Sequence, residues 1–276
     1  MSPSPISLPL FGNPPVVETL LGVFFQPVEL FTIVRRTQFW EKYLEKDFPS
    51  IEERQPLDEF REEFGDFMPP TGRVVRWQVS PFPSSRFWAT SIDRKRTVQI
   101  QNGALLANWE RTPGESNDYV HYEDRRNAFE KNLRTLDQFL RHNHFGDLIP
   151  TSCFITYINH IEFGDVSQFG SVLQDSLAVW KNETNEEWLP NVESATGSLS
   201  FAMADKTGRL HVNYAPGRRN ADNKHFLNLE LVARGAPRDN SIDAAIEWLD
   251  KGHEWIVRGF SALTRAEKHK SWGRVQ

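Results

Sequence analysis

The chain has 276 residues, of which 39% are hydrophobic and 25% are charged, so it can bury the core of one large domain. Its net charge of −5 disfavours nucleic acid as a partner, because binding to phosphates needs a basic surface. The single cysteine, Cys153, excludes an internal disulfide bond and any zinc site made of several thiolates. No apolar run reaches the roughly 20 residues of a membrane span, and the N-terminus lacks the pattern of a signal peptide. We therefore expect a cytoplasmic protein without membrane contact.

The first half of the chain predicts a strand, a helix, three strands and a second helix. Residues 1–15 are rich in proline and serine, which is typical of an extended arm. A hydrophobic period of two over 16–27 predicts a strand, and a period of three to four over 29–48 predicts an amphipathic helix. The acidic, proline-containing segment 49–70 is expected to be a loop with at most one helical turn. The remaining elements are strands over 73–80, 86–93 and 97–111, the last two joined as a hairpin by Asp93–Arg96, and a helix over 122–144.

The second half repeats this order of elements. It begins with an apolar strand over 151–162, which is followed by a helical segment within 166–180. Three strands come next, over 197–204, 209–216 and 225–235, and a long helix starts at about Ser241. Runs of strands with helices at their ends are typical of an α+β fold. We expect a single domain over 16–276, built from two pseudo-symmetric halves, 16–148 and 149–276, that form a curved, mainly antiparallel sheet of about eight strands with helices on one face.

The face of this sheet that the helices leave open is expected to be polar. In 225–235, for example, leucines alternate with polar residues, which predicts a strand with one solvated face. Such a face can bind a peptide, a protein or a flat ligand. Its candidate interaction residues are Arg76, Gln78, Gln99, Gln101, His211, Asn213, Asn228 and Glu230.

The terminal helix carries a histidine on its apolar stripe. Its sequence HEWIV, from His253, starts like the HExxH motif of zinc proteases but has Val257 where the second histidine would stand, so we predict no metal site. A lone histidine on an apolar face is more often a hydrogen-bonded structural residue than a ligand. Gly252 and Gly259 lie on a neighbouring stripe and lower helix stability by about 1 kcal/mol each, so another backbone is expected to approach them closely.

A small-molecule site between the terminal helix and the sheet is the alternative interpretation of the same residues. Asn159 and His160 end a strand, and one of the two must face the helices because strand side chains alternate. Two histidines near one cleft could also perform acid–base chemistry close to neutral pH. The candidate ligand-binding residues are His253, Trp255, Arg258, Trp272 and His160.

Four segments together resemble a sporadically distributed bacterial protein family of about this length. They are PPVVETLLGVFFQP, RFWATSID with TVQIQNGALLANWER, CFITYINHIE, and the terminal EWLDKGHEWIVRGF with WGR. The similarity extends over nearly the whole chain in order, and the terminal motif is its most specific part. It implies a bacterial, single-unit protein, and it supplies no reaction, ligand or catalytic residue.

The sequence therefore leaves functions of different classes open. No phosphate-binding loop, dinucleotide-binding motif or nucleophile elbow is present, so we predict no cofactor and no catalytic residue. The leading hypothesis is a non-enzymatic protein that binds a partner macromolecule, such as a co-encoded protein of a toxin–antitoxin or anti-phage defence system. The alternatives are a small-molecule-binding protein and a histidine-based enzyme.

Overall fold

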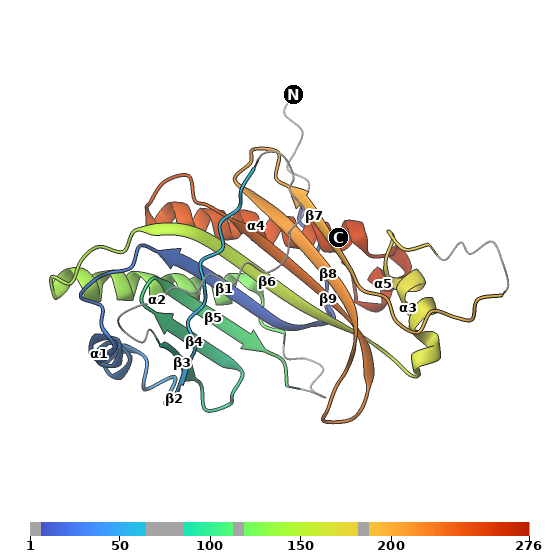
Figure 1. Ribbon diagram of the computed structural model, residues 1–276, viewed down its shortest axis with the longest axis horizontal. Helices are drawn as coiled ribbons and strands as arrows, with labels where there is room; N and C mark the ends of the chain where they lie inside the picture. Colours follow the sequence, from blue (N-terminus) through green and yellow to red (C-terminus); the bar gives the residue numbers. More distant parts are fainter. Residues whose placement is uncertain (1–6, 65–84, 113–118, 182–187, 276) are drawn as a thin grey trace.

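A computed structural model describes residues 7–64, 85–112, 119–181 and 188–275. The described strands are β1 (Val16–Phe25), β2 (Ser50–Arg54), β3 (Arg86–Thr90), β4 (Arg96–Gln101), β5 (Ala104–Glu110), β6 (Pro150–Phe163), β7 (Gly197–Ala202), β8 (Gly208–Arg218) and β9 (His225–Gly235). The described helices are α1 (Ile33–Tyr43), α2 (Tyr122–His142), the 3-10 turn η1 (Val166–Gln168), α3 (Phe169–Ser176), α4 (Ile242–Leu263) and α5 (Ala266–Ser271). The fold is α+β, as predicted (Figure 1).

All described strands join one open sheet in the order β2-β3-β4-β5-β1-β6-β9-β8-β7, and each neighbouring pair is antiparallel. The long strands β1 and β6 form the centre. Strands from the first part of the chain lie on one side of this pair, and strands from the second part lie on the other. The described sheet has nine strands instead of about eight, and β2 is an additional edge strand beside β3.

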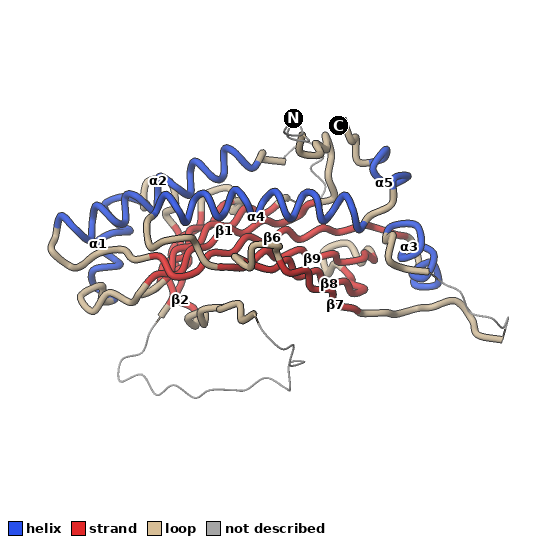
Figure 2. The backbone as a smooth tube through the Cα atoms, turned by 90° about the horizontal axis from the view of Figure 1, so that it is seen from above, coloured by secondary structure: helices blue, strands red, loops and turns tan. Residues whose placement is uncertain are grey.

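Helices α2 and α4 lie along one face of the sheet (Figure 2). In α4 the predicted apolar stripe faces the sheet, and Ser241 caps the first turn by accepting a hydrogen bond from the Ala244 amide. Gly252 and Gly259 do allow a close approach, but of side chains and not of a backbone as we expected. A Cβ atom on Gly252 would lie 2.9 Å from Ile155 Cγ2, and one on Gly259 would contact Leu210.

Two segments differ from the prediction made for them. The stretch 97–111 is a tight hairpin of β4 and β5, because Asn102-Gly103 turns the chain with Gly103 at φ +100°. The acidic segment forms the edge strand β2 and then an extended stretch, without a helical turn in its described part. The strand predicted at 73–80, which includes Arg76 and Gln78, lies outside the described residues.

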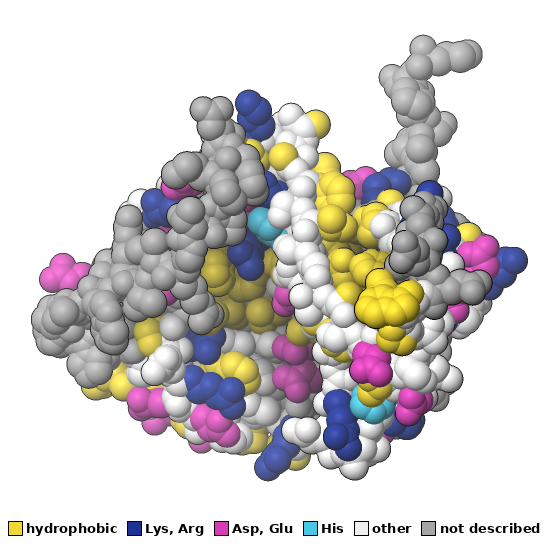
Figure 3. Space-filling model, turned by 45° about the vertical axis from the view of Figure 1, so that its right-hand side comes forward, with side chains coloured by type: hydrophobic (Ala, Val, Ile, Leu, Met, Phe, Trp, Pro, Cys, Tyr) yellow, Lys and Arg dark blue, Asp and Glu magenta, His cyan; other side chains and the backbone are white. Residues whose placement is uncertain are grey.

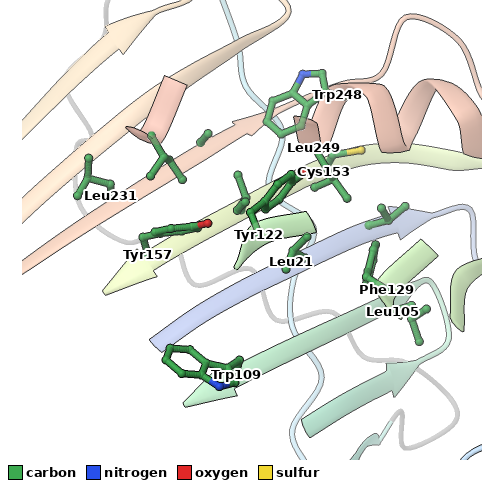
Figure 4. Close-up of a cluster of buried hydrophobic side chains, with 14 of the residues drawn as sticks. Leu21, Leu105, Trp109, Tyr122, Phe129, Cys153, Tyr157, Leu231, Trp248 and Leu249 are labelled. Atoms are coloured by element: carbon green, nitrogen blue, oxygen red, sulfur yellow. The ribbon is translucent and has the colours of Figure 1, made fainter. Parts of the chain in front are cut away.

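The main core fills the space between the sheet and the helices, and Figure 4 shows part of it. Leu21 from β1, Leu105 from β5 and Phe129 from α2 are among its fully buried members. A second, smaller apolar cluster lies on the opposite face of the sheet and consists of Phe24, Ala104, Leu106 and Phe154. The central strands are thus apolar on both faces, so the open face is less polar than we predicted.

The N-terminal arm lies against the body of the protein in its described part. Leu10 and Gly12 exchange backbone hydrogen bonds with Val275 and Gly273, and Phe11 forms a β-bridge with Arg274. The side chain of Phe11 is buried and contacts Phe260 of α4 edge to face. The arm consequently closes one side of a pocket beneath α4.

Candidate functional site

A pocket of about 500 Å³ lies between α4, the start of α2, strand β6 and the N-terminal arm. One part of its wall is apolar and comes mainly from the arm and α4. The other part is polar and includes His253 and three tyrosines. The apolar wall residues include Leu8, Leu10, Phe11, Ile256, Val257 and Phe260, and the polar ones are Tyr119, His121, Tyr122, Glu123, Tyr157, Asn159 and His253.

A buried arginine stands behind the polar wall. Arg125 of α2 donates hydrogen bonds to the hydroxyls of Thr19 and Tyr157, the latter at 3.0 Å, and its guanidinium lies 5.3 Å from the Tyr157 ring centroid. No carboxylate of the described residues forms an ion pair with it. A buried cation is costly unless an anion compensates it, so an arginine with only neutral partners is unusual.

His253 is connected to this arginine through Tyr157. The Tyr157 hydroxyl lies 3.1 Å from His253 Nδ1, and the His253 ring stacks on Tyr122 with a centroid distance of 3.8 Å. Burial and the nearby Arg125 charge lower the pKa of His253 from 6.5 to about 3, so the ring is neutral at physiological pH. The neutral ring carries one proton, and when the Tyr157 hydroxyl donates to Nδ1 that proton is on Nε2.

The structure does not bring the five predicted ligand residues together. Trp255 and Arg258 line a separate hollow on another side of α4, near Phe201 and Leu210. Trp272 is buried beside the Phe260 ring, with a centroid distance of 5.1 Å. His160 points to the open face of the sheet and stacks on Phe226, so Asn159 is the residue that faces the helices.

The open face is partly covered by the chain itself. Residues 55–64, which we call the strap, run across it below the sheet in the view of Figure 2. The Leu57 backbone exchanges two hydrogen bonds of 2.8 Å with the Gln101 side chain, and Phe60 packs on Phe24 and Phe154. Glu62 at the far end bonds to His211 Nε2 at 2.6 Å and to Arg209.

Several predicted interaction residues are therefore occupied within the chain. Gln99 and Gln101 lie on the predicted face but are buried, and Gln99 bonds to Arg86 and Asn108. His211 is held by Glu62 of the strap. Asn213 and Glu230 bond to each other at 2.9 Å. Asn228 lines the uncovered part of the face.

We expect the Gln101 side chain to hold the strap in place. Replacing Gln101 with alanine removes both bonds to the Leu57 backbone, so the Leu57 amide should exchange with solvent at least about ten times faster. Hydrogen–deuterium exchange read by mass spectrometry measures this rate. Gln138→Ala on the exposed side of α2 is the control, and an unchanged rate in Gln101→Ala would show that Phe60 and Glu62 hold the strap alone.

Beyond the strap the open face is hollowed into a groove of about 1180 Å³. Figure 3 shows a hollow on this side of the molecule, with hydrophobic side chains on part of its floor and charged side chains around it. The groove residues of most interest are Glu18, Glu110, Ile158, His160, Phe226 and Asn228.

Three carboxylates form a row across the groove end of the sheet. Glu18 of β1 stands directly opposite Glu110 of β5, and on its other side Ile158 of β6 stands opposite Glu230 of β9. None of the three forms an ion pair within the described part of the chain. Burial raises the pKa of Glu18, the Asn108 side chain that bonds to it at 2.8 Å opposes that shift, and the Glu110 and Glu230 charges add to it.

The other charges around the groove are paired. Arg219 binds Glu162 at 2.8 Å and Asp222 at 2.6 Å, and Lys224 also binds Glu162. The side-chain oxygen of Asn228 is buried and has no hydrogen-bond partner in the described part of the chain. The groove thus presents carboxylate and amide acceptors next to a solvated ion-pair cluster, and Arg111 and Thr112 also line it.

Of the groove residues, Asn228 was among the predicted interaction residues of the open face, but Glu18 and Glu110 were not. A local signal existed for Glu18, which is the one acidic residue within the apolar strand β1. Its opposition to Glu110 depends on the pairing of β1 with β5, which no local pattern reports.

The comparisons with known proteins find no matching family model, no matching curated protein and no matching solved structure. The resemblance to a bacterial family accordingly stays a prediction. Within the described residues no helix is long and apolar enough to cross a bilayer. The same residues contain no group of three or more His, Cys, Asp or Glu side chains arranged to hold a metal ion.

Proposed function

We propose that the protein is a non-enzymatic binding protein whose partner is another protein, and that the groove on the open face of the sheet accepts an extended, cationic segment of this partner. The row of Glu18, Glu110 and Glu230 carries the proposal. Glu18 and Glu110 stand directly opposite each other, and like charges in that position destabilise a sheet. Glu230 adds its negative charge from the far side of Ile158. A lysine or arginine side chain from a partner would relieve this repulsion.

The surroundings of the row fit a polypeptide chain better than a small cation. Ile158 and the half-buried Phe226 offer apolar contacts on either side of the acceptors, and the groove is large enough for several residues. The buried oxygen of Asn228 accepts one more hydrogen bond and suits a backbone amide of an extended segment.

The strap is an example of how this face holds an extended segment. It is fixed by backbone bonds to one side chain, Gln101, and by an aromatic anchor, Phe60, between two phenylalanines of the sheet. A partner segment that binds in the groove in the same way would place a cationic residue over the carboxylates and an apolar residue over Ile158. Co-encoded partners of the toxin–antitoxin or defence type are one source of such a segment.

Selection from a random decapeptide library with the full chain as bait tests this function. We expect enriched peptides to carry lysine or arginine next to an apolar residue. Their affinity should fall at least about ten-fold for the double variant Glu18→Gln, Glu230→Gln, which corresponds to about 1.4 kcal/mol. The amide side chains keep the size of the carboxylates and one acceptor oxygen, which is enough for the bonds from Asn108 and Asn213, so we expect the fold to be retained.

The matched control is Glu254→Gln, Glu267→Gln, which removes the same charge from exposed positions on the helix side. Peptides that bind this control and the wild type equally, but not the groove variant, support the proposal. Enrichment without basic residues, or affinity that survives in the groove variant, overturns it.

A further inference from the structure

The pocket beneath α4 lies on the other face of the sheet from the groove, and its chemistry suits a different kind of ligand. Its apolar wall can cover the body of a small molecule, and its volume of about 500 Å³ is typical of small-ligand sites. Tyr157 and His253, whose side chains lie 3.1 Å apart, are among its polar lining residues. A ligand that fills the pocket is therefore apolar along most of its length and polar at one end.

The polar end of the pocket presents donors and a positive charge. With the His253 proton on Nε2, this nitrogen is a neutral donor, and it has no hydrogen-bond partner in the described part of the chain. Arg125 stands behind Tyr157, one hydrogen bond from the pocket wall. Of the acidic groups nearby, Asp250 is bound by Tyr122 and Arg126. Glu123 also lines the pocket, and its residue is exposed to solvent.

We infer that this pocket binds a small amphipathic monocarboxylate, with its carboxylate at the Tyr157–His253 end and its hydrocarbon body along Phe11, Ile256 and Phe260. The carboxylate supplies the anion that Arg125 lacks. The buried end of the pocket discriminates against the corresponding alcohol, because a neutral hydroxyl leaves the arginine charge uncompensated. Hydrogen bonds to an ionised carboxylate are also about twice as strong as bonds between neutral groups.

Isothermal titration of the full chain with decanoate and with decanol tests this inference. We expect decanoate to bind at least about ten times more tightly than decanol. His253→Leu removes the Nε2 donor. It should weaken the binding of decanoate by about ten-fold and change the affinity for decanol little. Val257→Trp places an indole in the pocket from its α4 wall and should abolish the binding of both compounds.

Trp255→Phe, on another side of α4, is the matched control and should bind decanoate like the wild type. The thermal unfolding of each variant reports whether it is folded. A loss of binding counts only in a folded variant, and if His253→Leu is unfolded, the binding of decanoate to Val257→Trp tests the inference. Decanol binding as tightly as decanoate, or decanoate binding equally to Val257→Trp, overturns the inference. Absence of decanoate binding at about 1 mM overturns it as well. None of these results depends on the groove, so they test the pocket independently of the proposed function.

Discussion

Replacing Gly235 with alanine is expected to lower the free energy of unfolding by about 3 kcal/mol or more, which is the upper range for overpacking a well-packed core. A Cβ atom at this position would overlap the Thr207 carbonyl oxygen and would lie 2.6 Å from Trp248 Cζ2 and 2.7 Å from Gly208 Cα. Two of these three neighbours are backbone atoms, and the third belongs to a buried indole.

The Thr207 oxygen cannot move away without further loss. It accepts hydrogen bonds from Trp248 Nε1 at 3.0 Å and from the Ala236 amide at 3.1 Å. These bonds connect the β7–β8 turn, the end of β9 and helix α4. A shift at this point thus disturbs the packing of α4 on the sheet, which positions both His253 and the pocket.

Urea denaturation followed by tryptophan fluorescence measures the effect. Gly12→Ala is the neutral control, since the nearest atom to its Cβ would be 3.5 Å away. Gly217→Ala is the control for a crowded strand glycine, because its Cβ meets only the half-buried ring of Phe226, which can turn into the groove. A Gly235→Ala protein as stable as the Gly12→Ala protein would show that the turn at Thr207 can shift to accept the added Cβ atom at little cost in free energy.

The helices and strands with a regular spacing of hydrophobic residues could be predicted from sequence, because this spacing is a local property of the chain. The apolar stripe of α4, with Ser241 at its start, gave both the helix and its buried face. The two histidines, His253 in the middle of α4 and His160 near the end of β6, could not be grouped in the same way. His160 and Asn159 alternate on β6, and only the position of the helices decides which of them faces the pocket.

The grouping of Trp255 with His253 was wrong for a reason that the sequence itself contains. Residues two apart on a helix are separated by about 200° around its axis, so these two side chains leave α4 in different directions. The true neighbours of His253 are Tyr122, Tyr157 and, through Tyr157, Arg125. They come from α2 and β6, and no spacing in the sequence connects these elements to α4.

The covered open face was beyond sequence reasoning for another reason. The strap has an acidic, proline-containing composition that is typical of solvated loops. Its position depends on contacts with residues far away in sequence, such as Glu62 with His211 and Glu59 with Ser152. The hairpin at Asn102-Gly103, by contrast, carried the strongest local turn signal available.

The free energy of unfolding is expected to fall by about 2 kcal/mol between pH 7 and pH 5 because of His253 alone. In the unfolded chain this histidine takes up a proton near its usual pKa of 6.5. In the folded protein burial and the Arg125 charge lower its pKa to about 3, so it remains neutral in this range. The unfolded state therefore binds one more proton, and the stability that is present above pH 6.5 is lost progressively as the pH falls towards 3.

The pH range is chosen so that other groups interfere little. His160, whose pKa burial lowers to about 4, acts in the same direction and remains in all the variants. Carboxylates with lowered pKa, such as Glu62, lose their contribution only below about pH 4.5. Glu18 has a raised pKa and acts in the opposite direction, since its protonation favours the folded state.

The measurement is urea denaturation of the wild type and of His253→Leu at several values between pH 7 and pH 5. The difference in slope between the two should correspond to one proton, about 1.4 kcal/mol per pH unit at the acidic end. His142→Asn, at an exposed position of α2, should leave the slope unchanged. A His253→Leu slope equal to that of the wild type would mean that the folded protein protonates His253 readily. His253 would then be a positively charged donor in the pocket beneath α4 instead of a neutral one.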